Sequence, residues 1–351
     1  MEVIYSSVIP LKPSGFSSFR ETFERQLVPA NDIKIATGYV SEDSLMELKA
    51  ILSHYNASSR KKTCDLIIGM HGREGFTRPQ HEAACSLGRF LRDERIGEVR
   101  VCTAFKFHGK IYTFSNDAVP QASILGSSNL SGVLGLDNQW ETDILLTEAD
   151  SVNQLAELHR NLALKATKPI LEYTEYKIIQ QSDLLEGRNG VERVLSGELQ
   201  KVRDEQTKLS FSIPLKTELK SNLNAYFGKG RASSATKAIR PRAWYEVEVI
   251  VSSEITKQRG YPKADAPFTV YTDDGWKFRC KVSGDYSKNF RSEDDLQTLG
   301  RWVKGRMEAA GTLKVGELVT APMLQKYGKD RLVLTATRNP DVWFLDFSPS
   351  L

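Results

Sequence analysis

The sequence predicts an α/β domain over residues 1–170, a linker over residues 171–205 and a mainly-β domain over residues 206–351. Three observations support this division. In the first half, short apolar runs typical of buried strands alternate with segments of helical periodicity. In the second half, most segments alternate apolar with polar residues, as half-buried strands do. The charge also changes, because residues 1–180 hold 20 Lys and Arg against 22 Asp and Glu, whereas residues 181–351 hold 28 against 22.

The expected elements of the first half follow from these patterns. We expect strands at residues 1–9, 32–40, 64–70, 99–107 and 122–125, and helices at residues 17–27, 41–55, 80–93 and 150–166. Ser44 and Glu47 have the spacing of a capping box at the start of the second helix. Because strands alternate with helices, we expect a mainly parallel sheet.

The expected elements of the second half are mostly strands, at residues 209–215, 244–251, 268–271, 276–282, 318–323, 331–337 and 342–347. The residues 272–275, TDDG, form a hairpin turn, and residues 326–330 form another turn. One helix is expected at residues 294–310.

Composition excludes several classes of protein. No apolar run approaches the roughly 18 residues that a membrane span requires, and the start of the chain lacks the pattern of a signal peptide. The four cysteines, Cys64, Cys85, Cys102 and Cys280, are scattered without a CxxC pair. We therefore expect a cytoplasmic protein with free thiols, and neither a membrane partner nor a zinc site.

The polar residues between positions 107 and 145 point to phosphate chemistry. His108 and Lys110 follow one apolar run, the sequence GSSN at 126–129 follows the next, and Glu141 lies further on. On a strand, the i, i+2 spacing turns His108 and Lys110 to one face. Lys110 can bind a phosphate oxygen by charge, and Asn129 and Ser127 can donate hydrogen bonds to it. A histidine can attack phosphorus to form a covalent intermediate, and Glu141 can hold its other ring N–H.

The spacing H-x-K followed by G-S-x-N resembles the phospholipase D superfamily. The superfamily has an Asp five residues after the Lys, where this chain has Ser115. Glu141, after Asn129, is similar to the Glu of the nuclease members. The superfamily site uses two copies of the motif, and this chain has one, since His71-Gly72-Arg73 lacks the Lys and the following GSxN. The resemblance thus implies a homodimer with one shared site, which needs no metal or other cofactor.

Each part of the motif is common by chance when taken alone. A lone H-x-K pair, an ordinary GSSN turn or a solvated glutamate would mean little. Their order along an α/β pattern favours a site. His54, His81 and His159 lie on expected helices, where surface or packing roles are expected.

Two basic stretches of the second half are typical of nucleic-acid contacts. The first, at residues 216–242, can neutralise phosphates and reach base edges. The second consists of the polar face of the strand at 276–282 and the loop at 283–292. The other interpretation is that both stretches are ordinary solvated surface. The candidate DNA-binding residues are Lys216, Lys220, Asn222, Asn224, Arg231, Arg240, Arg242, Lys277, Arg279, Lys281, Lys288, Asn289 and Arg291.

The second half resembles the plant B3-type DNA-binding pseudobarrel, in which two arms grip the major groove. Together, the two halves are similar to the restriction endonucleases of the BfiI and NgoFVII type. That resemblance implies double-stranded DNA as the substrate, a nuclease half that dimerises, a recognition half that reads sequence and a cognate DNA methyltransferase that coexists with the enzyme.

The leading hypothesis is therefore a type II restriction endonuclease that works through a phosphohistidine without metal. One alternative is a phospholipase or phosphatidyl transferase of the same superfamily. The other is a sequence-specific DNA-binding protein whose first half is inactive and serves dimerisation. The single motif, Ser115 and the lack of a membrane segment argue against the first, and the retained His, Lys, Asn and Glu argue against the second.

Overall fold

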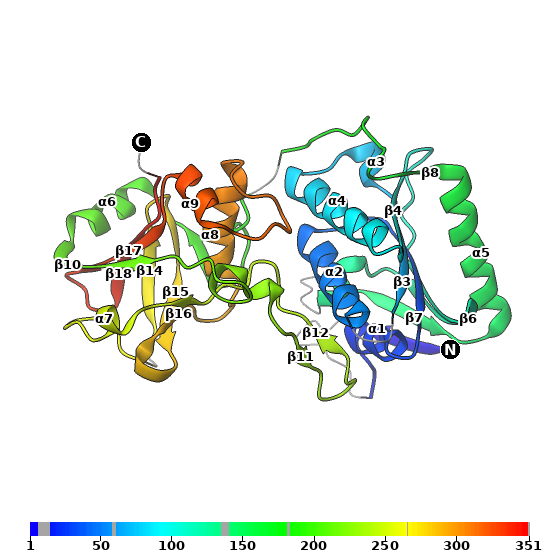
Figure 1. The fold of residues 1–351 in the computed structure, drawn as a ribbon, viewed down its shortest axis with the longest axis horizontal. Helices are drawn as coiled ribbons and strands as arrows, with labels where there is room; N and C mark the ends of the chain where they lie inside the picture. Colours follow the sequence, from blue (N-terminus) through cyan, green and yellow to red (C-terminus); the bar gives the residue numbers. More distant parts are fainter. Residues whose placement is uncertain (6–14, 58–60, 135–139, 181–182, 265, 350–351) are drawn as a thin grey trace. The chain divides into compact units, whose positions relative to one another are not determined.

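The computed structural model of the chain (Figure 1) describes residues 1–5, 15–57, 61–134, 140–180, 183–264 and 266–349. These residues form two compact units, Met1–Gln181 with Gly230–Pro241, and Ser182–Lys229 with Arg242–Leu351. The segment Gly230–Pro241, which the sequence assigned to the second half, thus groups with the first unit. The domain boundaries expected at residues 170 and 205 stay predictions.

The first unit is built on one sheet with the strand order β1-β7-β6-β5-β2-β3-β4-β8. Its strands are β1 (Glu2–Tyr5), β2 (Asp32–Thr37), β3 (Thr63–Ile68), β4 (Gly97–Cys102), β5 (Ile111–Asn116), β6 (Val119–Gly126), β7 (Thr142–Leu146) and β8 (Thr167–Pro169). The strand expected at 1–9 ends at Tyr5 in the structure, and residues 6–14 lie outside the described residues.

The sheet is mixed, so the expected mainly parallel arrangement was wrong. β2, β3 and β4 are parallel neighbours, whereas β5, β6, β7, β1 and β8 each pair antiparallel. The physical reason lies in the connections. Helices join β2 to β3 and β3 to β4, but β5 and β6 are joined by a two-residue turn at Asp117 and Ala118, and only antiparallel strands can be joined so tightly.

Helices cover both faces of this sheet (Figure 1): α1, α2 and α4 lie on one face, and α5 lies on the other. The helices and turns of the unit are α1 (Phe19–Leu27), α2 (Glu42–Asn56), α3 (His71–Glu74), α4 (Arg78–Asp93), η1 (Leu130–Leu134) and α5 (Ala149–Ala166). The capping box of α2 is formed by Ser41 and Ser44, not by Ser44 and Glu47, because the helix begins at Glu42 and Ser41 is its N-cap. Among the described residues, none of the helices is both long and apolar enough to cross a membrane.

An aromatic cluster packs α1 against the centre of the sheet. The rings of Phe19 and Phe23 on α1 meet Tyr112 of β5 edge to face, and Phe23 also meets Phe114. All four side chains are almost fully buried. Edge-to-face rings add to the free energy that burial of their area provides. This packing stabilises β5, which begins directly after Lys110.

The second unit is a mainly antiparallel sheet with the strand order β10-β17-β18-β14-β15-β16-β13, in which β14 and β18 run parallel. Its strands are β9 (Val191–Arg193), β10 (Gln206–Pro214), β13 (Val249–Ile250), β14 (Phe268–Thr272), β15 (Trp276–Ser283), β16 (Asn289–Ser292), β17 (Arg331–Thr337) and β18 (Val342–Asp346). The helices and turns are α6 (Ser196–Asp204), η2 (Asn222–Phe227), α7 (Ser253–Thr256), η3 (Asp285–Ser287), α8 (Thr298–Ala309) and α9 (Ala321–Tyr327).

The predicted hairpin of β14 and β15 is confirmed, with Gly275 at a φ of 87° in its turn. Two expected strands are corrected. Residues 318–323 lead into helix α9, because Pro322 suits a first helical turn and Gly328, at a φ of 90°, suits a helix end. Of residues 244–251, only β13 is a strand, because Trp244 and Tyr245 lie in a turn closed by the hydrogen bond from the Glu246 amide to the Ala243 carbonyl. The side chains of Trp244 and Tyr245 donate to the carboxylate of Glu308 on α8.

The buried histidine of α5 predicts acid sensitivity. His159 is 2% exposed, its Nε2 lies 3.2 Å from the Ile35 carbonyl, and burial lowers its pKa to about 4. Between pH 6.5 and pH 4, the unfolded chain takes up a proton that the folded chain does not, so the free energy of unfolding decreases as the pH falls. We expect the wild type to lose up to about 3 kcal/mol more than His159→Gln over this window, measured by urea unfolding. If the free energy of unfolding of the wild type and of His159→Gln changed equally with pH, the prediction would be wrong.

Candidate active site and DNA-binding surface

His108 lies in the loop that precedes β5, not on a strand as expected, because β4 ends at Cys102. The loop is packed against the end of β3. The Phe107 amide donates to the Gly69 carbonyl over 3.2 Å, and a Cβ on Gly69 would fall 1.9 Å from the Phe107 carbonyl oxygen. The His108 side chain is exposed, so it is accessible to a large substrate.

Lys110 lies beside His108, as the motif predicts. Its Nζ is 3.2 Å from each ring nitrogen of His108 and donates to the His108 carbonyl over 2.6 Å. The side chain is only 4% exposed. Burial lowers the pKa of Lys110, while the negative charges of Glu141 and Asp143 oppose that effect. The ammonium is thus a confined positive charge next to the candidate nucleophile.

Asn129 is oriented by the residues that directly follow β2. The Tyr39 amide donates to Asn129 Oδ1 over 2.9 Å, and the Thr37 hydroxyl donates to the same oxygen over 3.3 Å. Because the amide oxygen accepts both bonds, Nδ2 is the group turned outward as a donor. Between them, Gly38 has no side chain where a Cβ would lie 3.1 Å from His108 Cδ2. The end of β2 therefore supports both halves of the motif.

The GSSN turn is fastened to β7 and β5. Asp143, fully buried, accepts from the Ser128 amide over 3.0 Å and from its hydroxyl over 2.5 Å. The Tyr112 hydroxyl donates to the Ser128 carbonyl over 2.8 Å. The exposed Ser127 hydroxyl instead contacts the backbone of Thr142. Burial raises the pKa of Asp143, and its bonds to Ser128 oppose that rise.

Glu141 lies directly before β7 and is half-buried. Its negative charge acts on Lys110, where it favours the charged form of the ammonium. The structure thus brings His108, Lys110, Asn129 and Glu141 to one region of the first unit. The role expected for Glu141, acceptance of a ring N–H of His108, stays a prediction.

His71, in the segment that resembled a second motif, has a packing role. It is 5% exposed, its Nε2 accepts from the Val40 amide over 3.2 Å, and its Nδ1 lies 2.8 Å from the Gly75 carbonyl. Nδ1 must therefore carry the proton, and burial lowers the pKa of this histidine. Both ring nitrogens are occupied, which agrees with a single motif in this chain.

Sequence reasoning missed the residues that hold the motif in place. These residues are Thr37, Gly38, Tyr39, Tyr112 and Asp143, which belong to β2, β5 and β7 or directly follow them. Each lies between 15 and 92 positions along the chain from the motif residue that it contacts. Only the spacing of Asp143 after Glu141 is a signal that could have drawn attention to one of them.

The first basic stretch is divided between the units. Arg231 and Arg240 lie on β11 (Arg231–Ala232) and β12 (Ile239–Arg240), a hairpin that groups with the first unit. There Arg240 forms an ion pair with Glu24 of α1 over 2.7 Å, and the Thr236 hydroxyl donates to the same carboxylate. This contact lowers the pKa of Glu24 although burial opposes it.

Two pairs of like charges stand directly opposite one another in these arms. Arg231 pairs with Arg240 across β11 and β12, and Lys281 pairs with Arg291 across β15 and β16. Like charges at opposed positions destabilise a sheet. Arg291 Nε is also buried without a hydrogen-bond partner among the described residues. Such pairs are favourable when an anion binds between them.

Other candidate DNA contacts are exposed or form surface ion pairs. Lys220 is exposed and Lys216 is half-buried. The ion pairs join Arg242 to Glu246, Lys277 to Glu192, Arg279 to Glu293 and Lys288 to Asp285. Ion pairs at a partly exposed surface stabilise by only about 0–1 kcal/mol, so a phosphate can replace the carboxylate. Asn289 is half-buried on β16, where its backbone pairs with β13 and β15.

Asn222 and Asn224 do not have the exposed positions expected of DNA contacts. Asn222 is 4% exposed, and its Oδ1 accepts from the Ile250 amide. Asn224 is fully buried; its Nδ2 donates to the Thr217 and Val319 carbonyls, and its Oδ1 accepts from the Val319 amide. Both side chains, from η2, supply hydrogen-bond partners to backbone groups of other segments, which explains why polar residues occur at these buried positions.

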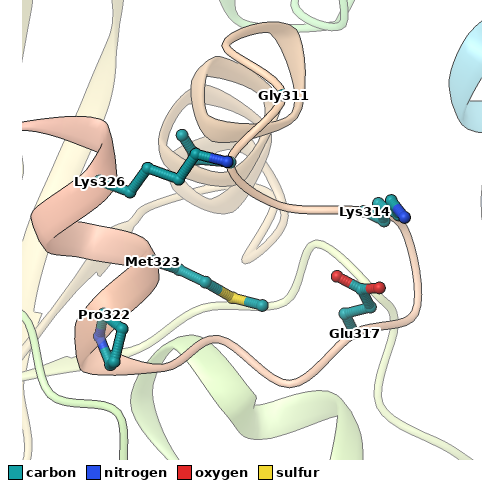
Figure 2. Close-up of a pocket in the computed structure, with 7 residues that line it drawn as sticks. Gly311, Lys314, Glu317, Pro322, Met323 and Lys326 are labelled. Atoms are coloured by element: carbon teal, nitrogen blue, oxygen red, sulfur yellow. The ribbon is translucent and has the colours of Figure 1, made fainter.

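A pocket of about 300 Å³ lies in the second unit (Figure 2). It is formed by the loop after α8 and by α9, with Lys314, Glu317, Met323 and Lys326 around it. None of the candidate catalytic or DNA-binding residues lines it. Among the described residues, no cluster of three His, Cys, Asp or Glu side chains is placed to hold a metal ion.

Comparisons with known proteins match both halves of the chain to one enzyme family. Residues 18–172 match the model of the NgoFVII restriction endonuclease N-terminal PLD domain, and residues 201–338 match that of the NgoFVII C-terminal B3-like DNA-binding domain. A comparison with curated protein sequences finds no match.

Solved structures show distant similarity. The phospholipase D family member Nuc from Salmonella typhimurium is 14% identical, with 48% of this chain and 95% of that chain covered and a TM-score of 0.33. Phosphatidylserine synthase from Haemophilus influenzae is 15% identical, with 48% and 39% covered and a TM-score of 0.33. NucT from Helicobacter pylori is 11% identical, with 42% and 88% covered and a TM-score of 0.29.

The close approach at Gly38 predicts that a single methyl group disturbs the site. In Gly38→Ala, the new Cβ would lie 3.1 Å from His108 Cδ2, so the imidazole must move by a few tenths of an ångström, whereas its 3.5 Å distance from Asn129 Oδ1 is an ordinary contact. We expect the rate of phosphodiester cleavage to fall about 10- to 100-fold. Gly197→Ala is the matched control, since its Cβ would meet nothing within 4 Å. Equal cleavage rates for both variants would contradict the prediction.

Proposed function

Since the chain belongs to the NgoFVII family of restriction endonucleases, with a phospholipase D-type nuclease domain and a B3-like DNA-binding domain, we propose that it is a type II restriction endonuclease. It hydrolyses double-stranded DNA through a covalent phosphohistidine, without a metal ion. The observation that supports this best is the position of Lys110 Nζ, 3.2 Å from the ring nitrogens of the exposed His108. The proposed nucleophile and the proposed phosphate-binding cation are thus adjacent.

In the first step of the proposed reaction, a ring nitrogen of His108 attacks the scissile phosphorus. A nitrogen–phosphorus bond forms, and the bond from phosphorus to the 3′ oxygen breaks. Lys110 and the Nδ2 group of Asn129 bind the non-bridging oxygens, on which negative charge develops. Ser127 adds a hydroxyl, and Glu141 orients the imidazole.

In the second step, water attacks phosphorus, the phosphohistidine is hydrolysed, and a 5′ phosphate is released. The first step needs a proton for the departing 3′ oxygen, and the second needs a base for the water. One histidine cannot be nucleophile and acid at once, and both ring nitrogens of His71 are occupied. We infer that, in a homodimer, the partner's His108 is the acid of the first step and the base of the second. One shared site then cuts the two strands in turn.

The second unit supplies sequence recognition in this proposal. Its proposed DNA contacts are Lys216, Lys220, Arg242, Lys277, Arg279, Lys281, Lys288, Asn289 and Arg291. Arg231 and Arg240, on the hairpin that groups with the first unit, are proposed as DNA contacts of that unit. Asn222 and Asn224 are not included, because both are buried. A cognate DNA methyltransferase that protects the host sites belongs to the same proposal.

Plasmid cleavage in excess EDTA tests the nuclease. We expect discrete fragments from the wild type and from His54→Ala, a control on the exposed face of α2, and none from His108→Ala, because the nucleophile is lost. An acid-labile protein–DNA adduct should be trapped with the wild type alone. Cleavage only after Mg²⁺ is added would overturn the phosphohistidine mechanism. Lipid turnover, or DNA binding without cleavage by the wild type, would favour the alternative functions.

The like-charge pair on β15 and β16 predicts a separable effect on DNA binding. Lys281→Ala and Arg291→Ala should each weaken binding to all sequences and reduce the slope of log K against log salt by about 1. Their thermal stability should not fall, because each removes an unfavourable like-charge contact. Lys208→Ala, an exposed lysine of β10 outside both arms, is the control. An unchanged salt slope in Arg291→Ala would exclude this pair from the surface.

A further inference from the structure

An aromatic ring outside the motif contacts the candidate nucleophile. Tyr39 directly follows Gly38 at the end of β2, and its ring meets the ring of His108 edge to face, with centroids 5.6 Å apart and planes at 78°. Tyr39 is half-buried, whereas His108 is exposed. Because His108 lies on a loop, regular sheet hydrogen bonds do not fix its orientation, and a contact of this kind can.

Tyr39 is itself held at both ends. Its hydroxyl donates to Glu74 Oε2 over 2.8 Å, and the ring of His71 packs against it edge to face at 5.5 Å. The ion pair with Lys106 and the bond from Tyr39 keep the pKa of Glu74 below its usual range, so the carboxylate stays charged. The buried His71 is fixed by its two backbone contacts.

The same short helix also holds the loop that leads to His108. Glu74 Oε1 accepts from Lys106 Nζ over 2.8 Å, and Arg73 Nη2 donates to the Ala104 carbonyl over 3.0 Å. Glu74 thus joins Tyr39, whose ring contacts His108, to Lys106, which lies two residues before His108 in the chain. Helix α3 connects the end of β2 to the nucleophile loop through these contacts.

We propose that Tyr39 is a positioning residue for His108, and that Glu74 and Lys106 hold Tyr39 and the loop in register. This rests on the proposed function of His108 as the nucleophile. The edge-to-face contact sets the plane of the imidazole, and the plane decides whether a ring nitrogen points along the line of attack on phosphorus. Lys110 sets the position of the phosphate, and Tyr39 sets the angle of the ring that attacks it.

The test compares Tyr39→Leu, Tyr39→Phe and Glu74→Gln with the wild type in single-turnover cleavage at saturating DNA. Tyr39→Leu should lower the cleavage rate about 100-fold, since a misplacement of about 1 Å has that effect, and the Kd for DNA should not change. Tyr39→Phe keeps the ring and should retain most of the wild-type cleavage rate. Glu74→Gln should cleave at a rate similar to that of Tyr39→Phe. Tyr173→Phe is the control, because its hydroxyl donates to the Gly72 carbonyl of the same helix.

A second readout does not depend on catalysis. In ¹⁵N-histidine-labelled full-length protein, the ring proton signals of His108, assigned with His108→Ala, should move in Tyr39→Leu because the ring current of Tyr39 is lost, and stay near their wild-type positions in Tyr39→Phe. Unmoved signals, or wild-type cleavage by Tyr39→Leu, would overturn the inference. Full cleavage by His108→Ala would instead overturn the proposed function, whether or not the signals move.

Discussion

The hydrogen bond from the Tyr39 amide to Asn129 Oδ1 is the contact on which the site depends. It joins the end of β2 to a turn 90 residues later, and it turns the Asn129 amide so that nitrogen faces outward. Gly38, beside it, lets His108 approach the same backbone. A backbone amide at the end of a central strand is among the least mobile donors that a protein has, so the motif is placed by the sheet and not by its own loops.

The buried positive charge of Lys110 is compensated by nearby carboxylates. Lys110 loses hydration, and two carboxylates, Glu141 and Asp143, compensate for part of that loss. Asp143 in turn is buried and bonded to Ser128. A confined cation of this kind interacts more strongly with a phosphate than a solvated one, because less water screens it. The same arrangement makes the site sensitive to the loss of any one member.

The DNA-binding surface follows a different principle. Its arms hold cations opposite one another, as Lys281 and Arg291 are, or in exposed ion pairs such as Arg279 with Glu293. Neither arrangement adds much to the stability of the free protein. A surface that is poorly compensated without its ligand gains more when phosphates bind. The Arg240–Glu24 contact shows that one basic residue of the hairpin is already compensated within the first unit.

The sequence by itself determined the two fold classes, the buried strands at the centre of the first sheet, and the identity of His108, Lys110 and Asn129 as neighbours. Short-range spacing contains that information, because residues two apart, or at the ends of adjacent strands, have few ways to be separated. The sequence also indicated the alternation of β15, which buries Trp276, Phe278, Cys280 and Val282.

Only the tertiary structure decided the strand order, the mixed direction of the sheet and the supports of the motif. Tyr39, Gly38 and Asp143 meet the motif because β2 pairs with β5 and β7 pairs with β6 in the sheet, and no local pattern of the sequence indicates which strands become neighbours. The burial of Asn222 and Asn224 was decided in the same way, since a polar side chain that replaces a missing backbone partner looks, in sequence, like one that faces solvent.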